Sequence, residues 1–222
     1  TSADQDLSIQ VHPTDDYAKT HENTLYGKSE SWYFIEPPSE GWIYADSLIE
    51  DKKEIKRSIL NGDYESVVGK RLVSKNDLVY IPSGTLHALT RGALVYEIQQ
   101  STDITYRFFD YNRLDNDGKL RDLHLEDALD TLNTANRVKS SEFPKDTLIS
   151  EQPYTMVRKT LENVYHNTTD VAVAITVSKG SMCVDGHSIL TGMSILVLPN
   201  ETISISQAAE EVVIATPKLY FK

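Results

Sequence analysis

Short apolar and aromatic runs, each closed by turn residues, dominate the first half of the chain. They include SIQVH, SWYFIEP, GWIYA, DLVYIPSG, ALVYEIQQ and TYRFFDY. Many short strands with Gly, Pro and Asn between them predict a sandwich or barrel. Three stretches have a helical pattern or composition: DDYAKTHEN, SLIEDKKEIKRSIL with Leu48, Ile55 and Ile59 on one face, and LHLEDALDTLN with Leu125, Ala128, Leu129 and Leu132 on another. We expect helical insertions on a mainly β core.

A polar stretch rich in Ser and Lys, around NRVKSSEFPKD, divides the chain. We predict a first domain at 1–133, a linker at 134–150 and a second domain at 151–222. The second domain repeats the strand pattern in TMVRKTLENVYH, DVAVAITVSKG, SMCVDG, SILVLP, ISISQ and EVVIATPKLYF. Its histidines, His166 and His187, stand apart from other potential ligands. We therefore interpret this domain as structural.

Composition narrows the classes of partner and compartment. The formal charge of −11 over 222 residues, without a cluster of Lys and Arg, argues against a nucleic-acid partner. No apolar run approaches the ~20 residues of a membrane span, so we expect no membrane partner. The single cysteine, Cys183, cannot form an internal disulfide, which favours the cytoplasm and makes the sequons at Asn167 and Asn200 chance matches. Because the chain starts with Thr1 and enters a strand almost at once, we expect an upstream segment.

Two stretches place polar side chains on a common face of a strand. In SIQVHP, alternation turns Gln10 and His12 to the same side, with Val11 opposite. In YGKSES, Lys28 and Glu30 are also two residues apart. Each pair alone is more typical of a solvated strand face.

A second histidine comes from IPSGTLHAL. Pro82 and Gly84 can shape a tight connection, after which His87 points into the barrel, although a lone strand histidine is usually a core residue. Taken together, four side chains from three strands offer two nitrogens and two oxygens, a set that suits Zn²⁺ with an open position for water or substrate: Gln10, His12, Glu30 and His87.

Five stretches carry a resemblance to a known family: LSIQVHPTDDYA, YGKSESWY, IPSGTLHAL, YEIQQSTDITYRFFDYNR and LHLEDAL. In this order, through roughly residues 4–132, they closely resemble the short bacterial form of type I mannose-6-phosphate isomerase, a zinc enzyme of the cupin superfamily. The second half looks like that family's metal-free cupin domain. The resemblance implies a mainly β fold of two cupin-like β-barrel or jelly-roll domains. It also implies an aldose–ketose isomerase of carbohydrate metabolism that interconverts mannose 6-phosphate and fructose 6-phosphate through a cis-enediolate.

The resemblance also implies the roles of particular residues. One Zn²⁺ per chain is expected on Gln10, His12, Glu30 and His87. The expected catalytic residues are Arg107, Lys28 and Glu97, and the expected substrate-binding residues are Ser8, Lys28, Asp103 and Arg107. The proton-shuttling base stays open among Glu97, Lys28 and Asp103, and we favour Lys28 for proton transfer or hydroxyl polarisation. The chain departs from the family in lacking its upstream strands.

Two other functions remain open at this point. One is a metal-containing cupin that binds a phosphosugar without turnover, although the chain keeps the cationic and shuttle groups that such a protein would lose. The other is an iron-dependent cupin oxygenase, which would favour more histidines and open coordination positions. The expected partner is a small phosphorylated sugar substrate, and the oligomeric state stays open. His21 and His124 match no motif and are interpreted as surface or packing residues.

Overall fold

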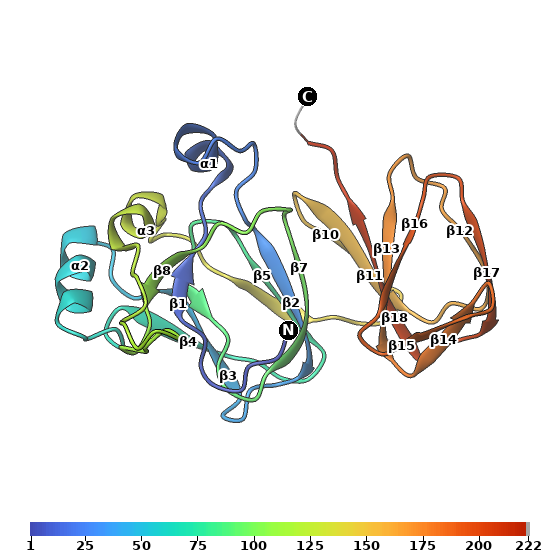
Figure 1. Ribbon diagram of the computed structural model, residues 1–222, viewed down its shortest axis with the longest axis horizontal. Helices are drawn as coiled ribbons and strands as arrows, with labels where there is room; N and C mark the ends of the chain where they lie inside the picture. Colours follow the sequence, from blue (N-terminus) through green and yellow to red (C-terminus); the bar gives the residue numbers. More distant parts are fainter. Residues whose placement is uncertain (221–222) are drawn as a thin grey trace. The chain divides into compact units, whose positions relative to one another are not determined.

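The computed structural model describes residues 1–220 and divides the chain into two compact β units (Figure 1). Unit 1 spans Thr1–Glu142 and unit 2 spans Phe143–Lys222. Each unit is described below by itself. The predicted mainly β class with helical insertions is confirmed, because strands outnumber helices in both units and all three described helices belong to unit 1.

Unit 1 contains nine strands and three helices among the described residues. The strands are β1 (Ile9–Val11), β2 (Glu30–Glu36), β3 (Trp42–Ser47), β4 (Val68–Leu72), β5 (Asp77–Ile81), β6 (His87–Ala88), β7 (Leu94–Gln99), β8 (Tyr106–Phe109) and β9 (Lys139–Glu142). The helices are α1 (Asp15–His21), α2 (Lys52–Leu60) and α3 (Leu125–Thr131). All the strand pairs are antiparallel, in two sheets ordered β4-β3-β6-β1-β8 and β7-β2-β5-β9.

Two apolar cores lie on opposite faces of the five-stranded sheet. One is formed with side chains of the four-stranded sheet and includes Trp32, Phe34 and Ile81. The other packs Ile9 and Val11 of β1 against α2 and α3 (Figure 1). Because alternate residues of a strand face opposite sides, this arrangement turns the even-numbered residues of β1 toward the space between the two sheets. That space holds the candidate site.

The helices form where their sequences provide caps and an apolar stripe. Thr14 caps α1 by accepting a hydrogen bond from the Tyr17 N–H, and Asp51 caps α2 by accepting one from the Lys53 N–H. The buried face of α2 carries Ile55 and Ile59, as predicted. Leu48 does not belong to this face, since it precedes the cap and is 63% exposed. That part of the prediction was wrong because the apolar spacing continues by coincidence through the loop before the cap.

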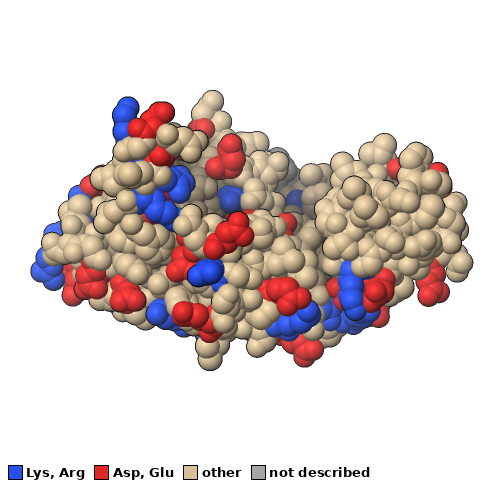
Figure 2. Space-filling view, turned by 60° about the horizontal axis from the view of Figure 1, so that its bottom comes forward, with Lys and Arg blue, Asp and Glu red and all other residues tan. Residues whose placement is uncertain are grey.

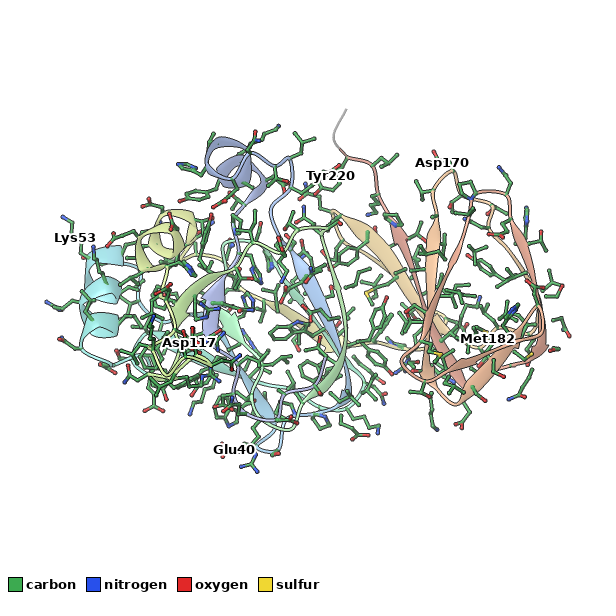
Figure 3. The ribbon with its side chains drawn as sticks, viewed as in Figure 1. Glu40, Lys53, Asp117, Asp170, Met182 and Tyr220 are labelled. Atoms are coloured by element: carbon green, nitrogen blue, oxygen red, sulfur yellow. The ribbon has the colours of Figure 1, made fainter. Side chains whose placement is uncertain are left out.

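Unit 2 contains nine described strands and has the same architecture of two antiparallel sheets. The strands are β10 (Leu148–Ser150), β11 (Tyr154–Lys159), β12 (Asn163–His166), β13 (Val173–Lys179), β14 (Ser181–Val184), β15 (His187–Leu190), β16 (Ser194–Val197), β17 (Thr202–Gln207) and β18 (Glu211–Pro217). The sheet orders are β10-β11-β18-β13-β16 and β12-β17-β14-β15. Its apolar core includes Ile175 and Val212, and also Met182, whose position is labelled in Figure 3. Both units therefore consist of separate sheets, and the described residues form no closed barrel.

The segment that we predicted as a linker contains the boundary between the units. Its residues form β9, which pairs with β5 in unit 1, and β10, which pairs with β11 in unit 2. Both strands lie at the edge of their sheets, and β9 is exposed throughout. Edge strands tolerate polar residues on both faces, which explains why this stretch resembles a linker in composition.

One predicted sequon proves to be a buried structural residue. The Asn167 side chain is fully buried, its amide nitrogen donates to the carbonyl oxygens of Val171, Val197 and Leu198, and its Oδ1 accepts from the N–H and hydroxyl of Thr169. An amide enclosed in this way is inaccessible to a glycosylating enzyme in the folded state. The chance interpretation of this sequon therefore agrees with the fold.

Candidate metal centre

Three strands of unit 1 deliver the predicted ligands to the space between its sheets. Gln10 lies on β1, with His12 directly after the strand, His87 begins β6, and Glu30 begins β2 in the facing sheet. His12, Glu30 and His87 are buried completely. We call these three residues the polar cluster. They are the only group of three or more His, Cys, Asp or Glu among the described residues whose ligand atoms gather within 4.8 Å of one another.

The strand register explains why residues far apart in the sequence meet here. Gln10 is the direct cross-strand partner of His87 on one side and of Arg107 on the other. Directly opposed residues of antiparallel strands point to the same face of a sheet. The three side chains therefore form a row across β6, β1 and β8, facing the sheet that carries Glu30.

The ligand atoms of the cluster lie in mutual contact. His12 Nε2 is 3.2 Å from Glu30 Oε2, and His87 Nε2 is 3.4 Å from Glu30 Oε1. The two imidazole rings lie 4.8 Å apart between centroids. The carboxylate thus stands between two imidazole nitrogens, one at each oxygen.

Backbone carbonyls select the tautomer of both imidazoles. Nδ1 of His12 lies 3.0 Å from the carbonyl oxygen of Ile104, and Nδ1 of His87 lies 2.8 Å from that of Thr85. A carbonyl oxygen only accepts hydrogen bonds, so each Nδ1 carries the proton and donates it. In the neutral rings Nε2 is then a lone pair directed at Glu30. Such N–H to carbonyl contacts are the usual support of metal-binding histidines.

The charges of the cluster favour a deprotonated Glu30 beside a neutral His87. Burial raises the pKa of Glu30, but the neighbouring His12, His87 and Lys28 outweigh burial and hold that pKa below its usual range. Burial is the main cause that lowers the pKa of His87 to about 4, and Glu30 opposes it only in part. At neutral pH the cluster therefore presents a carboxylate and an imidazole lone pair, the forms that bind metals.

The cluster fits a divalent metal ion. Both Glu30 oxygens are buried: Oε2 lies 3.1 Å from the Lys28 ammonium, whereas Oε1 accepts no hydrogen bond from the described residues and faces Nε2 of His87. Acceptors that face one another without a proton between them repel unless a cation lies among them. Ligands about 2.0–2.2 Å from a tetrahedral ion stand roughly 3.3–3.6 Å apart, close to the measured separations. The donor set of two imidazoles and a carboxylate suits Zn²⁺, although it does not identify the metal.

Gln10 and Lys28 border the cluster. The Gln10 side-chain amide nitrogen lies 3.4 Å from His87 Nε2, so a half-turn of the amide would present its oxygen at this place. Lys28 is 7% exposed, and its Nζ lies 3.1 Å from Glu30 Oε2 and 3.2 Å from His12 Nε2. The structure thus brings Lys28 and Glu30 to the same side, as their spacing predicts.

Arg107 faces the same space from β8. Its Nη1 donates to the carbonyl oxygen of Asp122 at 2.8 Å, while its buried Nε has no hydrogen-bond partner among the described residues. The backbone N–H of Arg107 donates to Nδ1 of His124, which gives this histidine a structural role consistent with its interpretation from sequence. The guanidinium is therefore held through Nη1, and its Nε–H is a donor that no described hydrogen bond uses.

The remaining predicted site residues lie near the centre without touching it. Glu97 is opposite Trp32 in the register and so shares its face with Glu30, but its carboxylate accepts a hydrogen bond from the Thr1 hydroxyl at 2.8 Å, and no described contact joins it to the cluster. Ser8 is buried just before β1, and Asp103 is exposed in the loop between β7 and β8. The roles predicted for these residues remain predictions.

Several residues that shape the site were missed by the sequence analysis. Ile104 and Thr85 act through backbone carbonyls, which no side-chain pattern can reveal. Gln100 and Asp15 hold the backbone next to Lys28 through side-chain hydrogen bonds. No pattern in the sequence singles out Gln100, which is buried in the fold.

A cleft of about 720 Å³ lies elsewhere in unit 1. It is lined by Gln5, Asp6, Ser39, Glu40, Trp42, Thr90, Arg91, Tyr111 and Arg113, of which Glu40 is labelled in Figure 3. These residues precede β1 and β3 and follow β6 and β8. Because the strands are antiparallel, these strand ends lie together at one end of the five-stranded sheet along the strand direction. His12 and His87 lie at the opposite strand ends. The cleft is therefore separate from the polar cluster.

The visible surface carries charges of both signs. On the face shown in Figure 2, Lys and Arg residues are interspersed with Asp and Glu, without a broad basic patch. Among the described residues, no helix has both the length and the apolar character needed to cross a bilayer.

The fold and the centre together define a mainly β, cupin-like protein with a candidate metal site in its first unit. No family model matches the chain. Among curated proteins, it is 45% identical over 130 residues to the probable mannose-6-phosphate isomerase GmuF of Bacillus subtilis and 43% identical over 130 residues to the mannose-6-phosphate isomerase ManA of the same organism. These matches cover 59% of this chain and 41% of each relative, so the chain spans about two fifths of the length of the curated relatives it matches.

Solved structures extend the likeness to nearly the whole chain. The mannose 6-phosphate isomerase of Bacillus subtilis matches with a TM-score of 0.75 and 28% identity, over 96% of this chain and 72% of the other. A putative mannosephosphate isomerase from Archaeoglobus fulgidus, 17% identical over 97% of this chain and 69% of the other, shares the fold with a TM-score of 0.72. The resemblance to mannose-6-phosphate isomerases predicted from the motifs is confirmed.

Proposed function

We propose that this chain belongs to a zinc-dependent enzyme that interconverts mannose 6-phosphate and fructose 6-phosphate. The observation that carries the proposal is the polar cluster, in which a buried carboxylate lies between the Nε2 atoms of two imidazoles whose Nδ1 atoms face backbone carbonyls. The relatives named mannose-6-phosphate isomerase supply the substrate class. We further propose that the first unit carries the chemistry, that the second is structural, and that the enzyme is cytoplasmic.

One Zn²⁺ per chain would be held by the polar cluster and the side-chain oxygen of Gln10. When bound, it acts as a Lewis acid that polarises the substrate carbonyl and the neighbouring hydroxyl. The three residues of the polar cluster are buried, and all four residues lie on or directly beside paired strands, which suits a site that must keep its geometry through turnover.

The reaction moves one proton from C2 to C1 and another from the C2 hydroxyl to the C1 oxygen, through a cis-enediolate. Lys28 is the side chain best placed to assist, because its Nζ lies within 3.2 Å of two cluster atoms in a nearly dry site. It would polarise a substrate hydroxyl or carry a proton between the two oxygens. We retain Glu97 as a second candidate for the carbon-bound proton.

Binding of the anionic substrate would depend on Arg107. A guanidinium stays charged at every working pH and binds a phosphate or oxyanion through parallel hydrogen bonds. Its contact with the Asp122 carbonyl orients it, and its remaining donors are available to the ligand. Ser8 and Asp103, near the ends of β1 and β8, would add contacts to the sugar.

The proposal is tested on the full-length protein that carries this chain. A coupled assay with mannose 6-phosphate is run on metal-replete and chelated samples, with metal content measured alongside. We expect one zinc per chain, isomerase activity that disappears on chelation, and its return when zinc is restored. His87→Ala should lose metal and activity together. The conservative control is His21→Ala, since His21 is exposed on α1 and makes no contact with the cluster.

Two other outcomes would replace the proposal. Stoichiometric zinc with phosphosugar binding but no turnover would indicate a silent binding cupin. Iron content together with oxygen uptake would indicate an oxygenase.

A further inference from the structure

The backbone around Lys28 is held by side chains that do not reach the metal centre. Oδ1 of Asp15 accepts hydrogen bonds from the Gly27 N–H at 2.7 Å and from the Gln100 amide at 3.0 Å. Oε1 of Gln100 accepts a bond from the Ser29 N–H at 2.6 Å. Asp15 and Gln100 thus hold both neighbours of Lys28.

We call Asp15, Gln100 and the backbone segment 27–29 that they hold the cradle. Further hydrogen bonds of the main chain complete it. The Lys28 N–H donates to the carbonyl oxygen of Pro13 at 3.1 Å, and the Gln100 N–H donates to that of Ser29, also at 3.1 Å. The hydroxyl of Thr102 donates to the Gly27 carbonyl oxygen at 3.0 Å. Every backbone N–H from residue 27 to residue 29 therefore has a defined partner, two of them side chains.

Close packing leaves this segment no alternative path. A Cβ on Gly27 would collide with the carbonyl oxygen of Pro13 and lie 2.6 Å from the carbonyl carbon of Thr14. The glycine is needed because two stretches of backbone meet here, one leading from His12 and the other leading to Glu30. The position of Lys28 is thereby tied to the two ligands that it contacts.

We propose that Asp15 and Gln100 are positioning residues, which fix the Lys28 ammonium beside the metal centre. Their own atoms touch neither the polar cluster nor Arg107 in any described contact. A lysine on a flexible four-carbon stem acts at a defined point only if its main chain is fixed, and a shift of about 1 Å in a catalytic group can lower a rate by on the order of 10²-fold. The inference rests on the proposed function where activity is measured.

The structure provides a conservative variant and a matched control. In Asp15→Asn the side-chain oxygen can still accept both hydrogen bonds, whereas Asp15→Ala removes them. Asp16 is the exposed neighbour in the same helix turn, and the only described hydrogen bond to it uses its backbone carbonyl. Asp16→Ala therefore changes charge and helix composition similarly without touching the cradle.

The first experiment is a double-mutant cycle in the full-length, zinc-loaded protein. We expect Asp15→Ala to lower kcat by on the order of 10- to 100-fold with nearly unchanged zinc content, and Asp15→Asn to restore most of the loss. In a Lys28→Ala background, Asp15→Ala should have less than about a twofold effect, because the group that it positions is gone. Asp16→Ala should match the parent. Equal losses with and without Lys28, or zinc loss in proportion to activity, would show that the cradle is merely structural and overturn the inference.

A second experiment separates this inference from the proposed function. In ¹⁵N-lysine-labelled protein, the ε-ammonium signal of Lys28 is assigned by its absence in Lys28→Arg. Asp15→Ala and Gln100→Ala should shift or broaden this signal, while Asp15→Asn and Asp16→Ala leave it in place. If the signal responds in this way but the protein has no isomerase activity, the proposed function fails and the positioning role stands. A signal indifferent to Asp15→Ala and Gln100→Ala refutes the positioning role whatever the activity.

Discussion

Replacing Arg107 by alanine tests the proposed substrate-binding half of the site without disturbing the proposed metal half. The structure gives the side chain one described hydrogen bond, from Nη1 to the Asp122 carbonyl, and leaves Nε without a partner. Loss of one such bond lowers the free energy of unfolding by only about 1–2 kcal/mol. Loss of a group that stabilises developing negative charge reduces kcat by on the order of 10²- to 10³-fold, which is about 3–4 kcal/mol. The functional effect should therefore exceed the structural one.

The assay combines steady-state kinetics, zinc analysis and thermal unfolding. Arg107→Ala should reduce kcat/KM for mannose 6-phosphate by on the order of 10²-fold or more while zinc stays near one per chain. Arg107→Lys should recover only part of this loss, because an ammonium cannot reproduce the two parallel hydrogen bonds of a guanidinium. Arg121→Ala is the matched control, since Arg121 is a half-exposed arginine that pairs with Asp110 at 3.2 Å.

Three results would refute the reasoning. Near-normal turnover in Arg107→Ala would make this arginine a strand residue without a catalytic role. Zinc loss as complete as that of His87→Ala would show that it supports the metal centre instead. Loss of activity in Arg121→Ala to the same degree would mean that the effect is one of general charge.

Three further predictions concern the centre and the fold. Glu30→Gln should lower zinc affinity by at least 10²-fold in a competition titration, because it removes the charge between the imidazoles, and unchanged affinity would exclude Glu30 as a ligand. In the zinc-free protein, the buried His87 has a pKa of about 4 against 6.5 unfolded, so the unfolded state binds more protons between these values. Denaturant titrations should therefore show stability falling as pH drops from about 6.5 to 4, by on the order of 3 kcal/mol, and His87→Leu should flatten this dependence. Asn167→Ala should lower the free energy of unfolding by about 3 kcal/mol, since several buried partners lose hydrogen bonds, whereas Asn200→Gly, at an exposed position with φ of 61°, should change it little.

The sequence predicted the site where potential ligand side chains recur at the two-residue period of a strand. Spacing of two residues in an extended chain correctly placed Gln10 with His12, and Lys28 with Glu30, because strand alternation is a local property. The convergence of three segments was predicted from donor chemistry and from the resemblance, and the cross-strand register between Gln10, His87 and Arg107 supplies the physical reason. The positions of α2 and α3 followed from apolar spacing and that of α1 from composition, except at Leu48, where spacing alone does not locate the cap.

Tertiary effects explain what the sequence did not reveal. The run TMVRKTLENVYH reads as one strand, but it forms β11 and β12, which pair in different sheets. The edge strands β9 and β10 owe their conformation to a partner on one side, which composition cannot indicate. The sequence cannot single out the carbonyl groups that fix the two imidazole tautomers, because every residue has a backbone carbonyl. Asp15 and Gln100 were equally hidden, since their role depends on backbone groups some 12 and 71 residues away.

The position of the cationic groups reconciles an acidic protein with the anionic substrate that we propose. A net charge of −11 spread over the surface is screened beyond about 8 Å at physiological ionic strength, so it only weakly opposes the approach of a phosphosugar. Inside the space between the sheets water is scarce, and nearby charges act at a lower effective dielectric. There Lys28, Arg107 and a bound metal ion would outweigh the single carboxylate of Glu30. The sign of the charge inside the site, rather than the sign of the net charge of the whole chain, therefore decides which ligands the site favours.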